Sequence, residues 1–172
     1  MSRSSSRRSA ASSGAQLYAV LQRVRPVHEL AARAVEAGLA DTALTVPLRA
    51  VLERVHAHGP QTVPAIARSL YVTRQGVQAL VDRGRDLGLV ETVPNPAHRR
   101  SHLVVLTPAG NDLFDTVRAD ELARLDVVAS GLDPVDVAAA VRVLDHLILS
   151  LEGLTHPQTP TTSTDPAERS TR

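Results

Sequence analysis

The sequence predicts a mainly helical fold with one short β-hairpin, and three observations support this. Most apolar residues recur at the i, i+3, i+4 spacing of helices that bury one face. Aromatic residues make up only 2% of the chain, so the core must be built from Leu, Val and Ala, which favours helices over a sandwich or barrel. Two short β-rich runs, 89–93 and 102–106, flank a polar loop with two prolines, as expected of a hairpin.

The N-terminal part of the chain predicts a tail followed by two helices. Residues 1–14 are rich in Ser and Arg and have no apolar period, so we expect disorder there. A helical pattern runs over 15–37, where Pro26 should kink or split the helix. The next helix has Thr45 as its N-cap and ends at Gly59, which is followed by proline.

Residues 62–90 predict two helices that are joined by a tight turn and followed by a strand. Thr62 and Thr73 are N-cap candidates, and the turn between the helices covers 70–72. Gly88 supplies the left-handed residue that often ends a helix. The second helix has an apolar stripe, and its opposite face carries side chains that can reach base edges: Arg74, Gln75 and Gln78. This pattern is typical of a helix-turn-helix.

Two long helices should close the fold. Thr107 is an N-cap followed by proline, which opens a helix to about Ala129, and Asp133 with Pro134 repeats this start signal. The last helix has apolar residues at alternating steps of four and three, which predicts a helix–helix seam. The seam fits an intramolecular bundle or, as we favour, a dimer. The Thr- and Pro-rich segment 155–172 should be a disordered tail, which leaves one domain over 15–154.

Composition narrows the possible functions. The chain has no cysteine, which excludes disulfides and thiolate metal ligands, and all 19 basic residues are Arg. Residues 65–102 hold six Arg against three acidic residues, so positive charge gathers around the helix-turn-helix. No apolar run approaches the ~20 residues that span a bilayer, so we expect a cytoplasmic protein without a membrane partner. We find no Gly-rich phosphate loop or nucleophile motif, and the seven His lack ligand spacing; we therefore predict no enzyme, cofactor or metal.

The order of these elements, together with several local motifs, resembles the MarR family of bacterial winged-helix regulators. The motifs are HRRSHLVVLTPAG, which fits the family's wing and its Leu-Thr-x-x-Gly exit, and ALVDRG, which fits its recognition helix. The resemblance covers about Ala15 to Leu151 and implies a winged helix-turn-helix over 45–106, flanked by dimerisation helices at about 15–38 and 107–153. It also implies a homodimer on a pseudo-palindromic operator, in most members a repressor that a small molecule releases.

The chain departs from the family pattern at two positions. His98 stands where the family most often has Asp, so the carboxylate that would orient the wing Arg is missing. Gly84 replaces the usual Leu of the recognition helix, at a cost of about 1 kcal/mol in helix propensity. We expect Leu87 to take over the core contact and the last turn of this helix to be flexible.

The predicted DNA contacts follow from these motifs. The helix over 73–87 should lie in the major groove, with Thr73 at a phosphate, Arg74 at a phosphate or guanine, and Gln75 and Gln78 at adenine edges. The wing should bring two arginines to the minor groove, while Arg83 fits a phosphate contact or a bracing pair with Asp82 equally well. The full predicted set is Thr62, Thr73, Arg74, Gln75, Gln78, Arg83, His98, Arg99 and Arg100.

The resemblance further implies a cleft for a small-molecule effector between the dimerisation helices and the winged helix-turn-helix. That cleft would draw on Tyr18, Arg25, His28 and Arg49, with Arg54 as a further candidate. The alternatives are a winged-helix regulator of another family, a DNA-binding protein that responds to no ligand, and a winged-helix module that binds protein. The arginines of the wing argue against the last of these, because a protein-binding surface should be apolar there.

Overall fold

Threonine side chains set the starts of three consecutive helices in residues 13–98 and 100–155, the part of the chain that the computed structural model describes. Helix α2 (Val46–His58) begins where the Thr45 hydroxyl oxygen accepts the Leu48 N–H at 3.3 Å. In the same way Thr62 caps α3 (Val63–Ser69) and Thr73 caps α4 (Arg74–Asp86). All three caps are confirmed as the sequence predicted them.

Helix α1 (Ser13–Gly38) runs unbroken through Pro26, so of the two predicted outcomes, a kink or a split, the split does not occur. Most of α1 is exposed, so water can reach the carbonyl that Pro26 leaves without an intrahelical donor. The helix also begins two residues earlier than expected, and α6 (Pro134–Thr155) includes Thr155. The remaining residues of the two predicted tails, 1–12 and 156–172, lie outside the described residues.

Helices α3 and α4 both end in a left-handed residue with the hydrogen bonds of a Schellman motif. After α4, Gly88 has φ 71°, its N–H donates to the Arg85 carbonyl, and the Leu89 N–H reaches back to the Gly84 carbonyl. After α3, the same place is taken by Tyr71 with φ 55°. A left-handed residue other than glycine is uncommon, so the turn of the helix-turn-helix is held in shape against a steric cost of about 1–2 kcal/mol.

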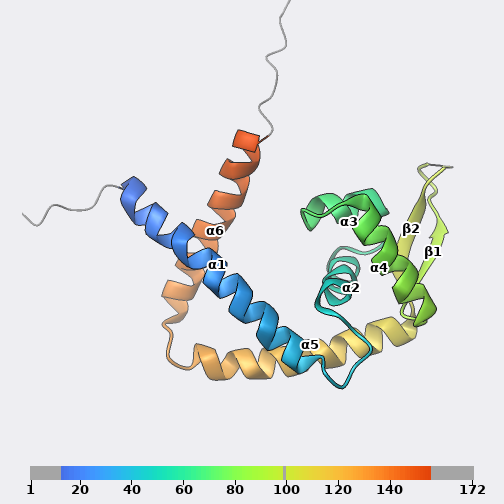
Figure 1. The fold of residues 1–172 in the computed structure, drawn as a ribbon, viewed down its shortest axis with the longest axis horizontal. Coiled ribbons are helices and arrows are strands. Elements are labelled where there is room, and N and C mark those ends of the chain that lie inside the picture. Colours follow the sequence, from blue (N-terminus) through green and yellow to red (C-terminus); the bar gives the residue numbers. More distant parts are fainter. Residues whose placement is uncertain (1–12, 99, 156–172) are drawn as a thin grey trace, which may run out of the picture. The chain divides into compact units, whose positions relative to one another are not determined.

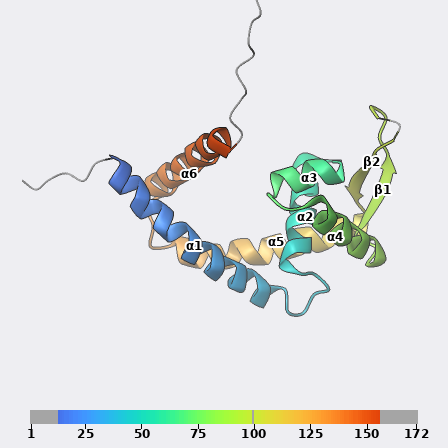
Figure 2. The same cartoon turned by 45° about the horizontal axis from the view of Figure 1, so that its top comes forward.

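A small antiparallel sheet follows α4. Strands β1 (Val90–Pro94) and β2 (His102–Leu106) pair in the register Val90↔Leu106 to Pro94↔His102. The second strand has its predicted bounds, and the first begins one residue later than predicted. In addition, Gln61 bridges to Val104 through two backbone hydrogen bonds, which ties the α2–α3 connection to the hairpin. In both Figure 1 and Figure 2 the hairpin lies beside α4.

The core lies around α2, which buries Leu48, Val51, Leu52 and Val55. Helix α4 adds its apolar stripe, and the sheet adds residues of both strands. Phe114 of α5 (Pro108–Ala129) is the only aromatic side chain in this cluster, as the composition required. The other buried members are Leu39, Leu44, Ile66, Ala67, Val77, Val81, Leu89, Val90, Val104 and Val117.

Gly84 is buried in this core, which gives it a packing role. A Cβ at this position would lie 2.9 Å from a methyl group of Val90 and 3.4 Å from one of Leu48. The family's Leu would therefore collide with β1 here, and Leu87 does pack against the core as expected. Gly84 thus allows α4 to approach the sheet closely.

The Leu-Thr-x-x-Gly exit of the hairpin forms a corner in which Thr107 joins the end of α4 to the start of α5. The Thr107 N–H donates to the Leu89 carbonyl at 3.1 Å, and its hydroxyl donates to the Gly88 carbonyl at 2.6 Å. The same hydroxyl oxygen accepts the Gly110 N–H at 3.0 Å. A Cβ on Gly110 would lie 2.0 Å from the Leu89 carbonyl oxygen, so only glycine fits this position.

The chain divides into two units, residues 1–125 and 126–172, with the boundary inside α5. The first unit holds the helix-turn-helix and the hairpin. Within the second unit, α6 starts at Pro134 as predicted, and the Val135 N–H donates to the Asp133 carboxylate at 2.8 Å. None of the described helices is both long enough and apolar enough to cross a membrane.

Candidate nucleic-acid interface

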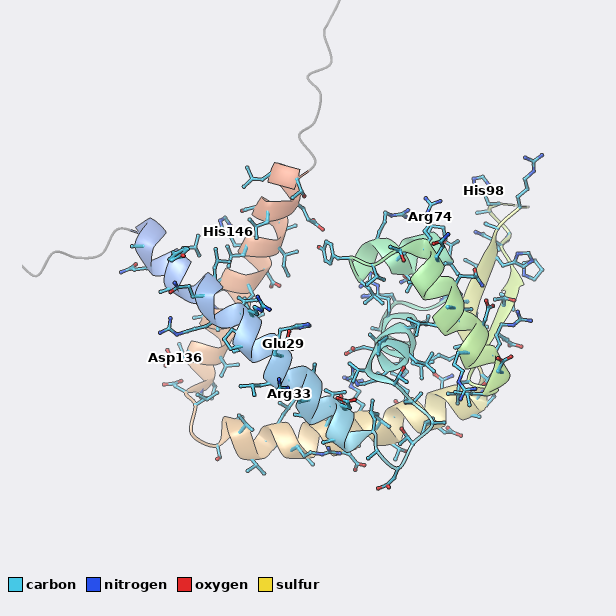
Figure 3. All side chains as sticks on the ribbon, in the orientation of Figure 1. Glu29, Arg33, Arg74, His98, Asp136 and His146 are labelled. Atoms are coloured by element: carbon cyan, nitrogen blue, oxygen red, sulfur yellow. The ribbon has the colours of Figure 1, made fainter. Side chains whose placement is uncertain are left out.

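Helix α4 buries one face and exposes a polar one. Val77, Val81 and Gly84 are buried, whereas Arg74, Gln75 and the other predicted contact residues of the helix are exposed. The exposed polar face is thus the one that the sequence predicted for reading DNA. Figure 3 shows Arg74 at the first turn of α4. Thr73 caps this turn with its hydroxyl oxygen, and the first-turn N–H groups of a helix attract phosphate.

A hydrogen-bonded row runs along this face. The Gln78 side-chain Nε2 donates to the Asp82 carboxylate at 3.0 Å, and the Arg85 guanidinium lies 3.9 Å from the same carboxylate oxygen. The bond and the ion pair are both within α4. Asp82 is therefore paired inside the helix, with Arg85 as its charged partner in place of Arg83.

The wing loop is held by Asn95 and Ser101. The Asn95 side chain donates to the Ser101 hydroxyl at 2.8 Å and accepts the Ala97 N–H at 3.0 Å. The Ser101 N–H and hydroxyl both donate to the His98 carbonyl. Backbone and small polar side chains thus fix the loop where the family's Asp is missing, and Figure 3 shows His98 at its tip.

A cleft of about 790 Å³ lies between the helix-turn-helix and the wing. It receives cationic or titratable side chains from α3, α4 and the wing, and no carboxylate is among its described lining residues. Its lining residues are Thr62, Val63, Pro64, Arg68, Gln78, Arg85, Thr92, Asn95, His98, Arg100, Ser101, His102 and Val104.

The structure brings together part of the predicted set. Thr62, Gln78, His98 and Arg100 line the cleft, and Thr73, Arg74 and Gln75 lie at the exposed start of α4. Arg83 lies about 140° around the helix from Gln78 and does not line the cleft. Arg99 lies outside the described residues.

Among the Arg and His side chains that line the cleft, three were not in the predicted set, namely Arg68, Arg85 and His102. Helical spacing could have found Arg85, because seven residues place it only about 20° from Gln78 around α4. Arg68 and His102 reach the cleft only through the packing of α3 and β2. No local sequence pattern predicts that these two side chains lie at the cleft.

The predicted effector residues are not gathered at one place in the first unit. Tyr18, Arg25 and His28 are exposed on α1, and Tyr18 lies about 30 Å along that helix from Gly38. Arg49 is already engaged on α2, and Arg54 Nη1 lies 2.5 Å from His58 Nε2. These residues form no shared cluster within the described part of the chain.

Arg49 joins α2 to α5 through ion pairs. Its Nε donates to Glu121 Oε1 at 2.5 Å, its Nη2 pairs with the other Glu121 oxygen, and its Nη1 lies 2.8 Å from Glu53 Oε2. Burial alone would lower the pKa of Arg49, but its hydrogen bond to Glu121 and the charge of Glu53 outweigh this and raise it. Beside it, His56 packs on Phe114 at 4.8 Å between ring centroids and lies 3.1 Å from Asp115.

Apolar side chains are exposed on α1 and on α6. On α1, Val27 and Leu30 are each 63% exposed, and on α6 Ile148 is 49% exposed. Further exposed residues on these two helices are Leu17, Leu21, Val24, Val137, Val141, Leu144 and Leu151. Surfaces of this kind mark contact sites with another molecule. Among the described residues no group of three His, Asp or Glu could hold a metal ion.

Comparison with known proteins places this geometry among regulators. A sequence model of the MarR family matches residues 44–101. An uncharacterised protein of Mycobacterium tuberculosis is 36% identical over 91 residues, which cover 53% of this chain and 64% of that protein. The transcriptional activatory protein BadR of Rhodopseudomonas palustris is 32% identical over 100 residues, 58% of this chain and 57% of BadR. The chain thus matches less than two thirds of these relatives' lengths.

Solved structures extend the likeness to nearly the whole fold. A crystal structure of a MarR family transcription regulator is 33% identical, with a TM-score of 0.71, and the match covers 81% of this chain and 93% of that one. Bordetella bronchiseptica BpsR, whose DNA binding is regulated by 6-hydroxynicotinic acid, matches at 22% identity and a TM-score of 0.64 over 74% of this chain and 91% of its own. At that identity the second likeness concerns the fold alone.

Proposed function

The chain belongs to the MarR family of transcription regulators, and from this premise we propose that it is a homodimeric, sequence-specific DNA-binding repressor that a small molecule releases. The observation that carries the DNA-binding part is the cleft beside α4. Three arginines and two histidines line it, and no carboxylate is among its described lining residues. Beside it lies the polar face of α4, on which Arg74 and Gln75 are exposed. This combination suits a phosphate backbone and an adjacent groove.

Each part of the interface has a distinct role in this proposal. The polar face of α4 enters the major groove, where Gln75 and Gln78 meet base edges and Arg74 meets a phosphate or guanine. The wing carries Arg100 to the minor groove, whose negative potential attracts arginine. Thr62 and Thr73 place helix starts at phosphates, so these contacts fix the register of the protein on the duplex.

The homodimer is supported by the exposed apolar residues of α1 and α6. A second copy of the chain would cover them, and two reading heads would then face half-sites about one helical turn, ~10 base pairs, apart. A pseudo-palindromic operator follows from the two-fold symmetry of such a dimer.

Ligand release would take place at side chains of α1. BpsR offers a precedent in the same fold, and the exposed Tyr18, Arg25 and His28 of α1 could meet a ligand where a partner subunit completes a cleft. Arg49 would then sense the ligand only by exchanging an existing carboxylate partner. The name of BadR gives activation as the second candidate for the direction of regulation.

Footprinting on the DNA upstream of the protein's own gene, with a salt titration, tests the proposal. We expect two protected half-sites and a logarithmic affinity that falls linearly with the logarithm of salt concentration. Protection of one half-site would contradict the dimer. If no site is protected and the affinity for DNA does not depend on salt, the DNA-binding role is wrong. Transcription from the same promoter in the presence of the protein separates repression from activation.

A further inference from the structure

The hydrogen bond between Gln78 and Asp82 carries a consequence for base recognition. A carboxylate can only accept hydrogen bonds, so the side of the Gln78 amide that faces Asp82 must be its NH₂ group. The Gln78 carbonyl oxygen is therefore directed away from Asp82. A free glutamine can turn its amide over and present either end, but this one has a preferred orientation.

We propose that Asp82 is a specificity-determining residue that orients Gln78 to recognise adenine; this inference rests on the DNA-binding function proposed above. In the major groove, adenine presents a donor at N6 and an acceptor at N7. Gln78 keeps one N–H that is not used by Asp82, and this N–H can donate to adenine N7. Its carbonyl oxygen can accept from the adenine N6 amino group. Guanine presents two acceptors, O6 and N7, and would place one of them against the Gln78 carbonyl oxygen.

The location of Asp82 supports this role. Its side chain is 54% exposed on the polar side of α4, within reach of Arg85, which lines the basic cleft. A carboxylate near phosphates opposes binding to every sequence by repulsion. Asp82 thus weakens binding to all DNA through its charge, while its selection of one orientation of Gln78 widens the gap between the operator and other DNA.

The test compares base preference in four variants on an operator defined by in vitro selection. Gln78→Ala first identifies the base pair that Gln78 reads, as the position where preference is lost. At that position we expect the wild-type protein to prefer adenine over guanine by about 5-fold to roughly 150-fold, the range for one bidentate contact. Asp82→Ala should remove most of this preference while it raises affinity for non-specific DNA.

Asp86→Ala is the matched control, because it removes the other carboxylate of α4. It should raise non-specific affinity in the same direction and leave the adenine preference unchanged. In the double variant Gln78→Ala/Asp82→Ala, the second change should have no further effect on preference, as a shared contact requires.

The outcomes separate this inference from the function on which it rests. If selection recovers no DNA sequence, the proposed function fails. If it recovers an operator but Asp82→Ala keeps the wild-type adenine preference, or changes it no more than Asp86→Ala does, the orienting role of Asp82 is wrong while DNA binding stands. A position read by Gln78 that prefers guanine would also overturn it.

Discussion

At the scale of single residues, Gly110 shows how one position can join two elements. Its Cα lies against the Leu89 carbonyl so closely that a Cβ would be 2.0 Å from the oxygen, and that oxygen belongs to the backbone and cannot turn aside. We expect Gly110→Ala to lower the free energy of unfolding by more than about 2 kcal/mol, measured by urea denaturation.

Gly153→Ala is the matched control, because at this helical glycine an added Cβ would meet no atom within 4 Å outside the backbone of its own helix. There the higher helix propensity of alanine should stabilise the protein by up to about 1 kcal/mol. Equal losses in the two variants would show that the close contact at Leu89 is not what requires glycine.

Two arginines of α4 should differ in their contribution to DNA binding. Arg85 lines the cleft and Arg83 points to another side of α4, although Arg83 is nearer to Gln78 in sequence. We expect Arg85→Ala to lower DNA affinity and to reduce the salt slope by about one phosphate equivalent, and Arg83→Ala to change both quantities much less. Titrations of labelled operator at several salt concentrations measure them, and a larger loss in Arg83→Ala would refute the assignment of faces.

Arg100 should contribute to binding on all sequences. We expect Arg100→Ala to weaken binding to operator and non-specific DNA alike and to lower the salt slope, because a phosphate or minor-groove contact is lost. Arg100→Lys keeps the charge, so its salt slope should stay near that of the wild type. An unchanged affinity and slope in Arg100→Ala would remove the wing from the interface.

At the scale of elements, the ion pairs of Arg49 link α2 to α5. Glu121→Ala leaves the half-buried guanidinium without its main partner, and we expect a loss of about 2–3 kcal/mol in the free energy of unfolding. Glu53→Ala is the control on the same arginine; its side chain is 53% exposed, and its loss should stay below about 1 kcal/mol. Similar losses for both carboxylates would contradict the α2–α5 link.

This link should not depend on pH in the physiological range. The pKa of Arg49 is raised in the folded state, so its contribution is fully present below the pKa of the unfolded state and is lost only as the pH rises through the still higher pKa of the folded state. Stability measured between pH 6 and 9 should therefore show no transition from this arginine.

Local chemistry explains why most elements could be predicted from the sequence. Threonine caps and prolines in first turns define helix starts within a few residues, and Gly88 marks the end of α4 without ambiguity. Where the outcome is decided by packing, the sequence was a poorer guide. Tyr71 adopts a left-handed turn without being glycine, and Pro26 does not split α1.

The residues of the candidate site also differ in how well the sequence could predict them. Gln78 and Arg85 could be placed on one face from their spacing along a single helix. His102 and Arg68 come from β2 and α3, and the backbone bridge between Gln61 and Val104 ties the start of α3 to β2. Such contacts between distant residues have no signature in one sequence.

At the scale of the whole molecule, the exposed seam of α6 predicts assembly. We expect Ile148→Asp to give a mass close to that of one chain, 18.3 kDa, in light scattering, and to lower operator affinity more than tenfold, since each half-site would be bound separately. Arg142→Asp is the control, because Arg142 lies on the opposite side of α6 from the seam. A dimeric Ile148→Asp protein would show that α6 does not form the interface.

The corner at Thr107 has a mechanical consequence. Only Thr107 separates β2 from α5, and its amide and hydroxyl both donate to the backbone that follows α4, so the hairpin and the long helix are joined without a free linker. The start of α5 should then move as one rigid piece with the hairpin and the end of α4. A twist applied to it would be delivered to the wing and to the end of α4 together, and we expect slow exchange of the Thr107 amide hydrogen whether or not DNA is bound.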